Sequence, residues 1–238
     1  VRSSESPQVQ NTALLLVSGL AVIAPEQVLH SVMPIFTFMG SSVLKKDDDY
    51  SIMVIDQTID QVVPVLVQSL RNQKRDVVAG TSELLLSFTA AFEHIPSHRR
   101  QRLFQALVTK LGAKDFLFAV LAMLANLHGL DKNVSVLMTY LASNLDPQDQ
   151  LITYQKYLSL ASDALKPKPG ISQILLGVGN EGAKDKHVIA EGLLRSLSYC
   201  LKHSSLKAQM AVIFNSDAED TVTQVAGLFS QILEQVLV

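Results

Sequence analysis

The sequence predicts an all-helical (all-α) fold, an α-solenoid in which antiparallel helix pairs stack one on the next. Three observations support this class. Apolar residues recur every three or four positions along almost the whole chain, turn-forming residues interrupt the pattern at short intervals, and no segment sustains the period-two alternation of a β-strand. Of the 238 residues 48% are hydrophobic and only 18% are charged, a balance that excludes a disordered chain.

The helical period is clearest in residues 50–70 and 101–111. In the first segment one face carries only large aliphatic side chains, namely Ile52, Ile55, Ile59, Val62, Val63, Leu66 and Leu70. In the second, leucine, valine and phenylalanine take one face, and Arg102, Gln105 and Lys110 take the other. Both segments are therefore expected to be amphipathic helices that bury one side.

Proline, glycine and asparagine divide the chain into about a dozen helices joined by short turns, which favours antiparallel neighbours. The first helices of successive pairs are expected to begin near Val9, Tyr50, Ser97, Asn133 and Ala183. These steps centre on the ~40–47 residues of HEAT or armadillo repeats. The spacing predicts about five HEAT-like pairs, with a generic helical bundle as the alternative.

Residues 59–79 show one such unit in detail. Pro64 lies inside the first helix, where it removes a hydrogen bond and bends the helix, and a short polar turn with basic residues precedes a second amphipathic segment. Because stacked units share one core, residues 1–238 are expected to form a single HEAT-repeat solenoid segment. A Gly- and Pro-rich stretch at about 166–186 is expected to be an irregular insertion.

The composition limits the cellular compartments and the classes of partner that we expect for this chain. The longest uncharged apolar stretches, 13–24 and 116–127, are each about a dozen residues, whereas a membrane span needs about 20, so we expect core helices and no membrane partner. The chain starts without methionine or a signal-peptide pattern, which suggests a segment of a longer protein. The single cysteine excludes a disulfide framework and fits a reducing compartment.

Two motifs resemble ligand sites but lack the required context. Residues 177–182 spell G-x-G-x-x-G, yet no convincing strand precedes them and no carboxylate stands about 20 residues later, so a helix joint is favoured. His94 and His98 have the spacing of zinc ligands, but Pro96 between them indicates a turn. Neither a cofactor nor a metal is expected.

Two further clusters have plain structural interpretations. Cys200 lies three residues from His203 but follows the apolar pattern of its helix, which predicts a buried structural thiol and not a nucleophile. Asp47, Asp48 and Asp49 precede a helix and are expected to cap its first N–H groups. The sequence therefore predicts no catalytic residue, no enzyme activity and no small-molecule substrate.

Basic residues are expected to gather on the edge of the solenoid where one pair joins the next. The net charge of −2 argues against broad nucleic-acid binding, so any RNA contact would be local. The hypothesis is a ridge that touches RNA phosphates or an acidic partner, and the alternative is ordinary solvated charge. The residues of this ridge are Lys45, Lys46, Arg99, Arg100, Arg102, Lys132, Lys166 and Lys168.

The most specific signal lies in residues 28–40, which read VLHSVMPIFTFMG, with DDDYS at 47–51 and VIDQT at 54–58. This stretch resembles the large HEAT-repeat U3 small-nucleolar-RNA-associated protein family of the small-subunit processome, to which human HEAT-repeat-containing protein 1 belongs. The resemblance is specific over about 26–70 and fades into general helical-repeat character elsewhere. Members of this family are very much longer than 238 residues.

The resemblance implies a scaffold role in ribosome biogenesis, in the nucleus and nucleolus. The family belongs to an early complex that loads on the 5′ external transcribed spacer of nascent pre-ribosomal RNA, is needed for processing toward 18S RNA, and is linked to RNA polymerase I transcription. The expected partners are protein subunits of that complex, with U3 snoRNA or spacer RNA as further candidates at an edge. The alternative is a karyopherin-like adaptor or transport module.

Overall fold

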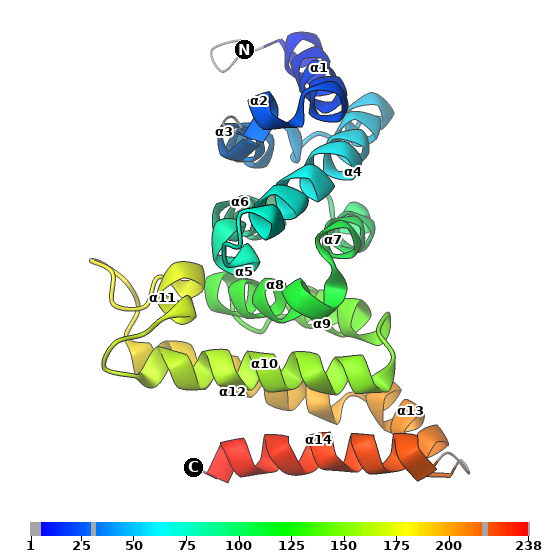
Figure 1. Cartoon of the computed structure of the whole chain (residues 1–238), viewed down its shortest axis with the longest axis vertical. Coiled ribbons are helices and arrows are strands. Elements are labelled where there is room, and N and C mark those ends of the chain that lie inside the picture. The colour runs from blue at the N-terminus through cyan, green and yellow to red at the C-terminus, as the bar shows by residue number, and fades with distance from the viewer. Residues whose placement is uncertain (1–5, 30–31, 216–218, 238) are drawn as a thin grey trace. The chain divides into compact units, whose positions relative to one another are not determined.

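The computed structural model describes residues 6–29, 32–215 and 219–237, and every element within these ranges is a helix (Figure 1). The predicted all-α class is thereby confirmed. His30 and Ser31, which belong to the stretch that carries the family resemblance, lie outside the described residues. The chain divides into two compact units, residues 1–113 and 114–238. One continuous solenoid over residues 1–238 stays a prediction.

In the first unit, three long helices form one layer. They are α1 (Pro7–Ile23), α4 (Asp49–Asn72) and α7 (Ser97–Leu111). Helix α4 packs against both of the others. Two buried hydrogen bonds set the register of α1 on α4: the Asn11 amide donates to the Ser51 hydroxyl at 3.0 Å, and the Ser18 hydroxyl donates to Thr58 at 3.1 Å. Both pairs are 40 residues apart, so the two helices run parallel with the period of the repeat.

Shorter helices form the second layer of this unit. They are α2 (Pro25–Leu29), α3 (Val32–Phe38), a π-helical turn η1 (Met39–Val43), α5 (Val77–Gly80), α6 (Ser82–Ala90) and a 3₁₀ turn η2 (Phe92–His94). The fully buried rings of Phe36 and Phe88 join α3 to α6 with centroids 6.0 Å apart. Gly40 is required because a Cβ there would lie 2.8 Å from the Ser87 carbonyl oxygen.

Helix α4 is the core helix of the first unit. Its N-terminus is capped as predicted, since the Asp48 carboxylate accepts hydrogen bonds from the Ser51 N–H at 2.8 Å and from its hydroxyl at 2.7 Å. The helix continues through Pro64. By length and composition α4 could cross a membrane, but its apolar face is buried and it packs against α1 and α7. It is therefore read as a core helix.

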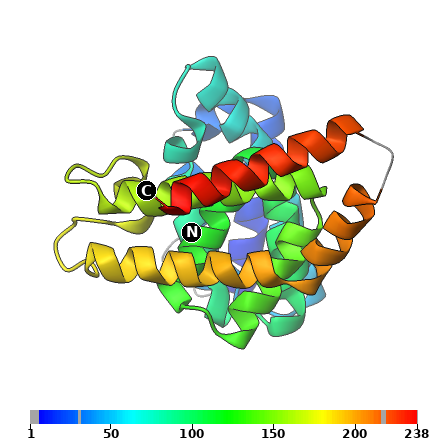
Figure 2. The ribbon, with the colours of Figure 1, turned by 90° about the horizontal axis from the view of Figure 1, so that it is seen from below.

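The second unit is built around α10, which packs against α12 and α14 (Figures 1 and 2). Its helices are α8 (Ala113–His128), α9 (Lys132–Ser143), α10 (Pro147–Leu165), α11 (Ile171–Leu176), α12 (Lys186–Lys202), α13 (Ser204–Phe214) and α14 (Glu219–Leu237). Every residue of α8 from Phe116 to Ala125 is buried. The prediction that the apolar stretch 116–127 forms a core helix is therefore confirmed.

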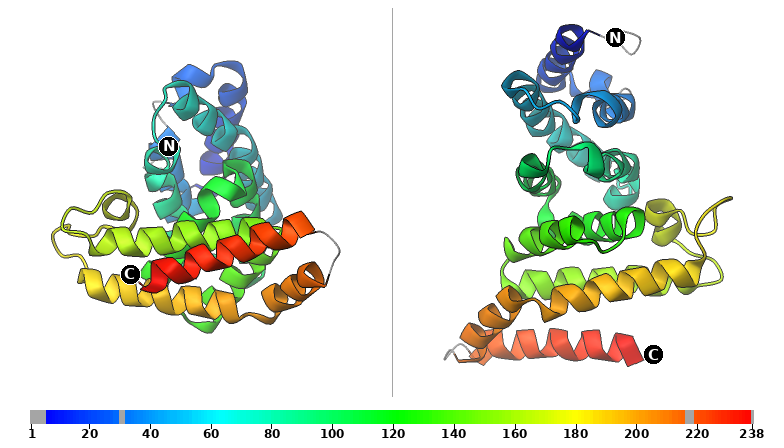
Figure 3. Two further views of the ribbon diagram at one scale, coloured as in Figure 1. Left: turned by 60° about the horizontal axis from the view of Figure 1, so that its bottom comes forward. Right: turned by 180° about the vertical axis from the view of Figure 1, so that it is seen from behind.

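Residues 166–186 contain the short helix α11 between two non-helical joints, residues 166–170 and 177–185. Figure 3 shows α11 beyond the end of α8, with the second joint extending away from the long helices. Asn126 of α8 connects the two, because its side-chain amide donates to the Leu176 carbonyl at 3.4 Å and its own carbonyl accepts from Lys184. The second joint, residues 177–185, is thus attached to α8 near both of its ends.

The first helices of the pairs begin close to the predicted positions. The structure starts them at Pro7, Asp49, Ser97, Lys132 and Lys186. Four of these starts lie within two residues of Val9, Tyr50, Ser97 and Asn133. The fifth lies three residues after Ala183, because Asp185 accepts a hydrogen bond from the His187 N–H at 2.8 Å and so caps the helix later than expected.

Replacing Phe88 by alanine tests the packing of α3 on α6. The variant should lose about 3–5 kcal/mol of unfolding free energy, because a fully buried ring is removed and a cavity is left. The measurement is urea unfolding followed by circular dichroism. Leu86→Ala on the same helix is the control, since Leu86 is 46% exposed, and it should cost less than about 1 kcal/mol. Equal losses for the two variants would contradict this packing.

Candidate interaction surface

The eight basic residues predicted to form a ridge are divided between the two units. Lys45, Lys46, Arg99, Arg100 and Arg102 lie in the first unit, and Lys132, Lys166 and Lys168 lie in the second. Their surroundings differ in kind. Some of these side chains make contacts that stabilise the fold, and others are exposed at the surface.

Arg99, at the start of α7, is an internal residue. It is only 8% exposed, its guanidinium donates to the Lys46 carbonyl oxygen, and it lies 3.9 Å from the Asp47 carboxylate. Burial lowers its pKa, against the opposing effect of Asp47. Arg99 therefore fastens the turn before α4 onto α7, a contact between residues 53 positions apart.

Arg100 and Arg102 also make contacts within the first unit. The Arg100 guanidinium stacks over the Phe92 ring at 4.4 Å and donates to the Ile95 carbonyl at 2.9 Å. Arg102 forms an ion pair with Asp56 of α4 at 2.5 Å, although its side chain is 75% exposed. An exposed pair of this kind contributes little to stability. Arg102 can therefore exchange this partner for another anion at small cost.

Lys45 and Lys46 lie at the turn after η1. The Lys46 ammonium donates to the Gln10 side chain at 3.2 Å. Lys45 is exposed and lines an open groove of about 590 Å³ between η1 and α6, together with Glu83 and His94. Opposite charges share this groove, so it is not a purely basic surface.

In the second unit, Lys132 and Lys168 are exposed, and Lys166 belongs to a structural cluster around Asp163. The Asp163 carboxylate is nearly buried and accepts hydrogen bonds from the Gly170 N–H at 2.9 Å, the Ser172 N–H at 3.0 Å and the Ser172 hydroxyl at 2.8 Å, while Lys166 lies 3.1 Å away. Burial alone would raise the pKa of Asp163, but these donors outweigh it and hold the pKa at about 2.

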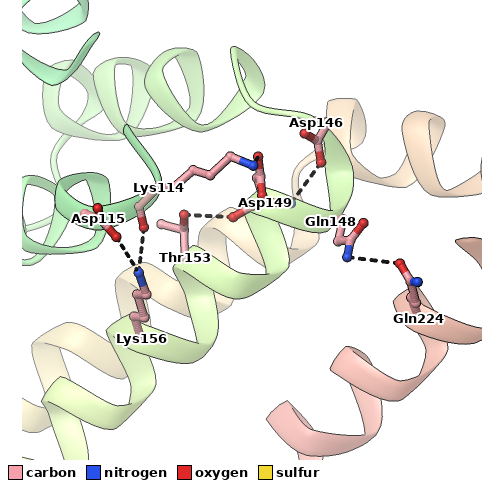
Figure 4. Close-up of polar contacts among 8 residues, drawn as sticks. All are labelled: Lys114, Asp115, Asp146, Gln148, Asp149, Thr153, Lys156 and Gln224. Atoms are coloured by element: carbon pink, nitrogen blue, oxygen red, sulfur yellow. Dashed lines mark hydrogen bonds and ion pairs between the residues drawn. The ribbon is translucent and has the colours of Figure 1, made fainter. Parts of the chain in front are cut away.

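Helix α8 meets α10 through two charged contacts, which Figure 4 shows. Lys114 pairs with Asp149 at 2.8 Å, and Lys156 lies 3.4 Å from the Asp115 carboxylate and donates to the Lys114 carbonyl at 2.7 Å. The hydrogen bond and the charge of Asp149 raise the pKa of Lys114. Asp149 and Lys156 are two helical turns apart and so lie on the same flank of α10. Ion pairs between side chains therefore connect this flank to α8.

A second flank of α10, about 100° around the helix from the first, meets α14 through neutral amides. Gln148 donates to Gln224 at 3.1 Å, and Gln155 donates to Gln231 at 2.8 Å (the first pair is drawn in Figure 4). Both pairs are separated by 76 residues, so α10 and α14 run parallel in a fixed register. Beyond the second pair the surface is hollowed into an open groove of about 700 Å³. These glutamines are not among the residues predicted from the sequence to form a site.

The G-x-G-x-x-G segment follows a helix. Residues 177–182 leave α11 through Gly177, whose φ of +70° ends that helix, and form turns that lead to α12. A dinucleotide site requires a strand before the motif and a helix that begins at its last glycine. The prediction of a joint between helices is confirmed.

Cys200, His94 and His98, which the sequence motifs single out, lie in helices of the fold. Cys200 is 2% exposed, and burial raises its pKa to about 12, so the thiol is protonated and unreactive near neutral pH. This confirms the predicted buried thiol. His94 lies in η2 and His98 in α7, where His98 is 3.2 Å from Asp47. Among the residues that the structure describes, no three His, Cys, Asp or Glu side chains gather as metal ligands would.

Known proteins match this chain along its whole length. It is 70% identical over 237 residues to U3 small nucleolar RNA-associated protein 10 of Aspergillus fumigatus, 69% identical to the protein of that name from Neosartorya fischeri, and 67% identical to that from Coccidioides immitis. A family model described as "HEATR1-like, HEAT repeats" matches residues 76–167. All of this chain is covered in each comparison, and it spans 13% of each of these relatives.

These matches agree with the fold. The family match and the all-helical structure confirm the predicted class of HEAT-like helix pairs, and the named relatives confirm the resemblance seen in residues 28–58. The matched residues 76–167 include α10, from whose two flanks the ionic and the amide contacts extend.

Replacing Asp163 by asparagine tests the cluster that holds residues 166–172. The variant should lose about 1–3 kcal/mol of unfolding free energy at pH 7, since a nearly buried carboxylate with several donors loses its charge. The pKa of Asp163 is about 2 in the folded chain and 3.8 ordinarily. Its contribution is therefore complete above pH 4 and is lost as the pH falls toward 2.

The measurement for Asp163 is urea unfolding of the parent chain and the variant between pH 2 and 7. The difference between them should shrink as the pH falls below 4. Lys168→Ala, an exposed position in the same joint, is the control and should change stability by less than about 0.5 kcal/mol. A difference that stays constant across this pH range would show that the Asp163 charge is not what stabilises the joint.

Proposed function

Because this chain belongs to the HEAT-repeat family of U3 small nucleolar RNA-associated proteins, we propose that it is a non-catalytic scaffold segment in ribosome biogenesis. The observation that carries the proposal is 70% identity over the full chain to a protein whose name states association with U3 small nucleolar RNA. Identity at this level extends over both units, so the same helices and contacts are expected in those relatives.

The finer proposal places the segment in the small-subunit processome of the nucleolus, where it acts on nascent pre-ribosomal RNA on the path to 18S RNA. The link to RNA polymerase I transcription belongs to this finer proposal as well. Its support is the family relationship, together with side chains that serve structure: Arg99 joins a turn to a helix, Cys200 is buried, and Asp163 organises a joint. Protein subunits of the assembly are the proposed partners.

Affinity purification tests the scaffold proposal. The tagged chain, expressed in an Aspergillus host, should enrich U3 RNA over U6 RNA and tRNA when the eluted RNAs are quantified. A variant with Phe88→Ala, which lacks a fully buried ring, should enrich less because its fold is weakened. Recovery of a folded chain with Ran-dependent cargo and without U3 RNA would favour the transport alternative and would overturn the scaffold proposal.

We also propose that the members of the predicted ridge that are exposed or half-buried contact RNA or an acidic partner. In the first unit these are Lys45, Lys46, Arg100 and Arg102, and in the second they are Lys132, Lys166 and Lys168. Arg99 takes no part, because it is buried. Lys132 and Lys168 support the proposal best, since both ammonium groups are exposed at the end of the unit where α9 begins and α10 ends.

Changing Lys132 and Lys168 together to alanine tests this contact. If both neutralise phosphates, affinity for single-stranded RNA should fall, and the slope of log affinity against log salt should decrease in magnitude by about 1.4. Fluorescence anisotropy across a salt series measures both. The double change of Lys202 and Lys207 to alanine removes equal charge from exposed positions in the same unit and should have little effect. Equal slopes for the two variants would refute the contact.

A further inference from the structure

Helix α10 has two polar flanks of different chemistry. Toward α8 it presents Asp149 and Lys156, and each forms an ion pair with a residue of α8. The charged groups of this flank therefore already have partners. Toward α14 it presents Gln148 and Gln155, which meet glutamines. The lining of the open groove of about 700 Å³ includes Gln155 but neither Asp149 nor Lys156, so another molecule can be seated on the amide flank.

The groove has nearly no net charge. Its walls are made by Gln155, Ser159 and Ser162 of α10 and by Gln231 and Gln235 of α14. The charged side chains in its lining are one lysine, Lys166, and one glutamate, Glu234, and Lys166 already lies 3.1 Å from Asp163. A nucleic-acid backbone requires several unpaired cations, which this lining does not offer.

The bridge between Gln155 and Gln231 leaves a specific pair of hydrogen-bonding atoms. It uses the amide nitrogen of Gln155 and the amide oxygen of Gln231. Each side-chain amide carries both a donor and an acceptor, so the bridge leaves the Gln155 oxygen as an acceptor and the Gln231 nitrogen as a donor for another molecule. That arrangement matches the N–H and C=O groups of a peptide main chain.

We propose that the groove between α10 and α14 binds an extended peptide segment of a partner protein. An extended segment has unpaired N–H and C=O groups to offer, whereas a helix has already used its own internally. Ser162 supplies a further hydroxyl, and Leu165, which is 40% exposed, supplies an apolar contact at the same end. The inference rests on the proposed scaffold role, because it names the chemistry of one partner contact.

The test uses the full 238-residue chain and a phage-displayed library of random 12-residue peptides. Selected peptides are synthesised, and their affinity is measured by fluorescence anisotropy. We expect binding that weakens at least about tenfold when Gln155 and Gln231 are both changed to alanine, since two main-chain contacts are lost. Ser162→Trp, which fills the groove from an exposed position, should also abolish binding.

A matched control is built into the same pair of helices. Gln148→Ala with Gln224→Ala removes a bridge of the same chemistry and register outside the groove lining, and it should leave peptide affinity within about twofold. Methylation of the peptide's main-chain nitrogens should weaken binding, because donors are removed. Circular dichroism confirms that each variant retains its helices.

Four results would overturn the proposal. They are no peptide selected by the chain, equal binding by the Gln155 and Gln231 variant, no effect of main-chain methylation, and binding of a 20-nucleotide single-stranded RNA that depends on Gln155 and Gln231. The last result would assign the groove to RNA. The scaffold role is tested separately, since enrichment of U3 RNA by the chain does not require that this groove be occupied.

Discussion

The parallel packing of long helices at a fixed offset is the constraint on which each unit depends. In the first unit, α1 lies on α4 with polar pairs 40 residues apart, and in the second, α10 lies on α14 with pairs 76 residues apart. An amphipathic helix pair cannot bury its own apolar stripe, so each pair needs the next one. The hydrophobic effect supplies the attraction, and the polar pairs select the register.

The polar pairs differ according to how deeply they lie. Asn11 with Ser51 and Ser18 with Thr58 are buried, where an unpaired polar group would be costly, so both members must match. The contacts of α10 lie nearer the surface, apart from the buried Asp149 carboxylate, whose partner Lys114 is exposed, and there ions and amides are tolerated alike. Contacts near the surface can therefore differ in chemistry. On α10 one flank forms ion pairs with α8, and the other forms amide bridges to α14 beside an open groove.

Much of the fold could be predicted because helical period and breakers are local properties. The starts of four first helices, the cap at Asp48 and the burial of Cys200 all follow from neighbouring residues. The position of Arg99 could not be predicted, since its partner Lys46 is 53 positions away. The glutamines of α10 did leave a signal, because Gln-Asp at 148–149 recurs as Gln-Lys at 155–156, two turns later.

The two-turn spacing on α10 also limits where insertions and deletions can be accepted in such a segment. One residue inserted between Asp149 and Gln155 would rotate the rest of the helix by about 100°. The ion pair at Lys156 and the amide bridge at Gln155 would then both face away from their partners. Insertions and deletions should therefore collect in the joints, such as residues 177–185, while the distance between the paired positions of α10 stays constant across orthologues.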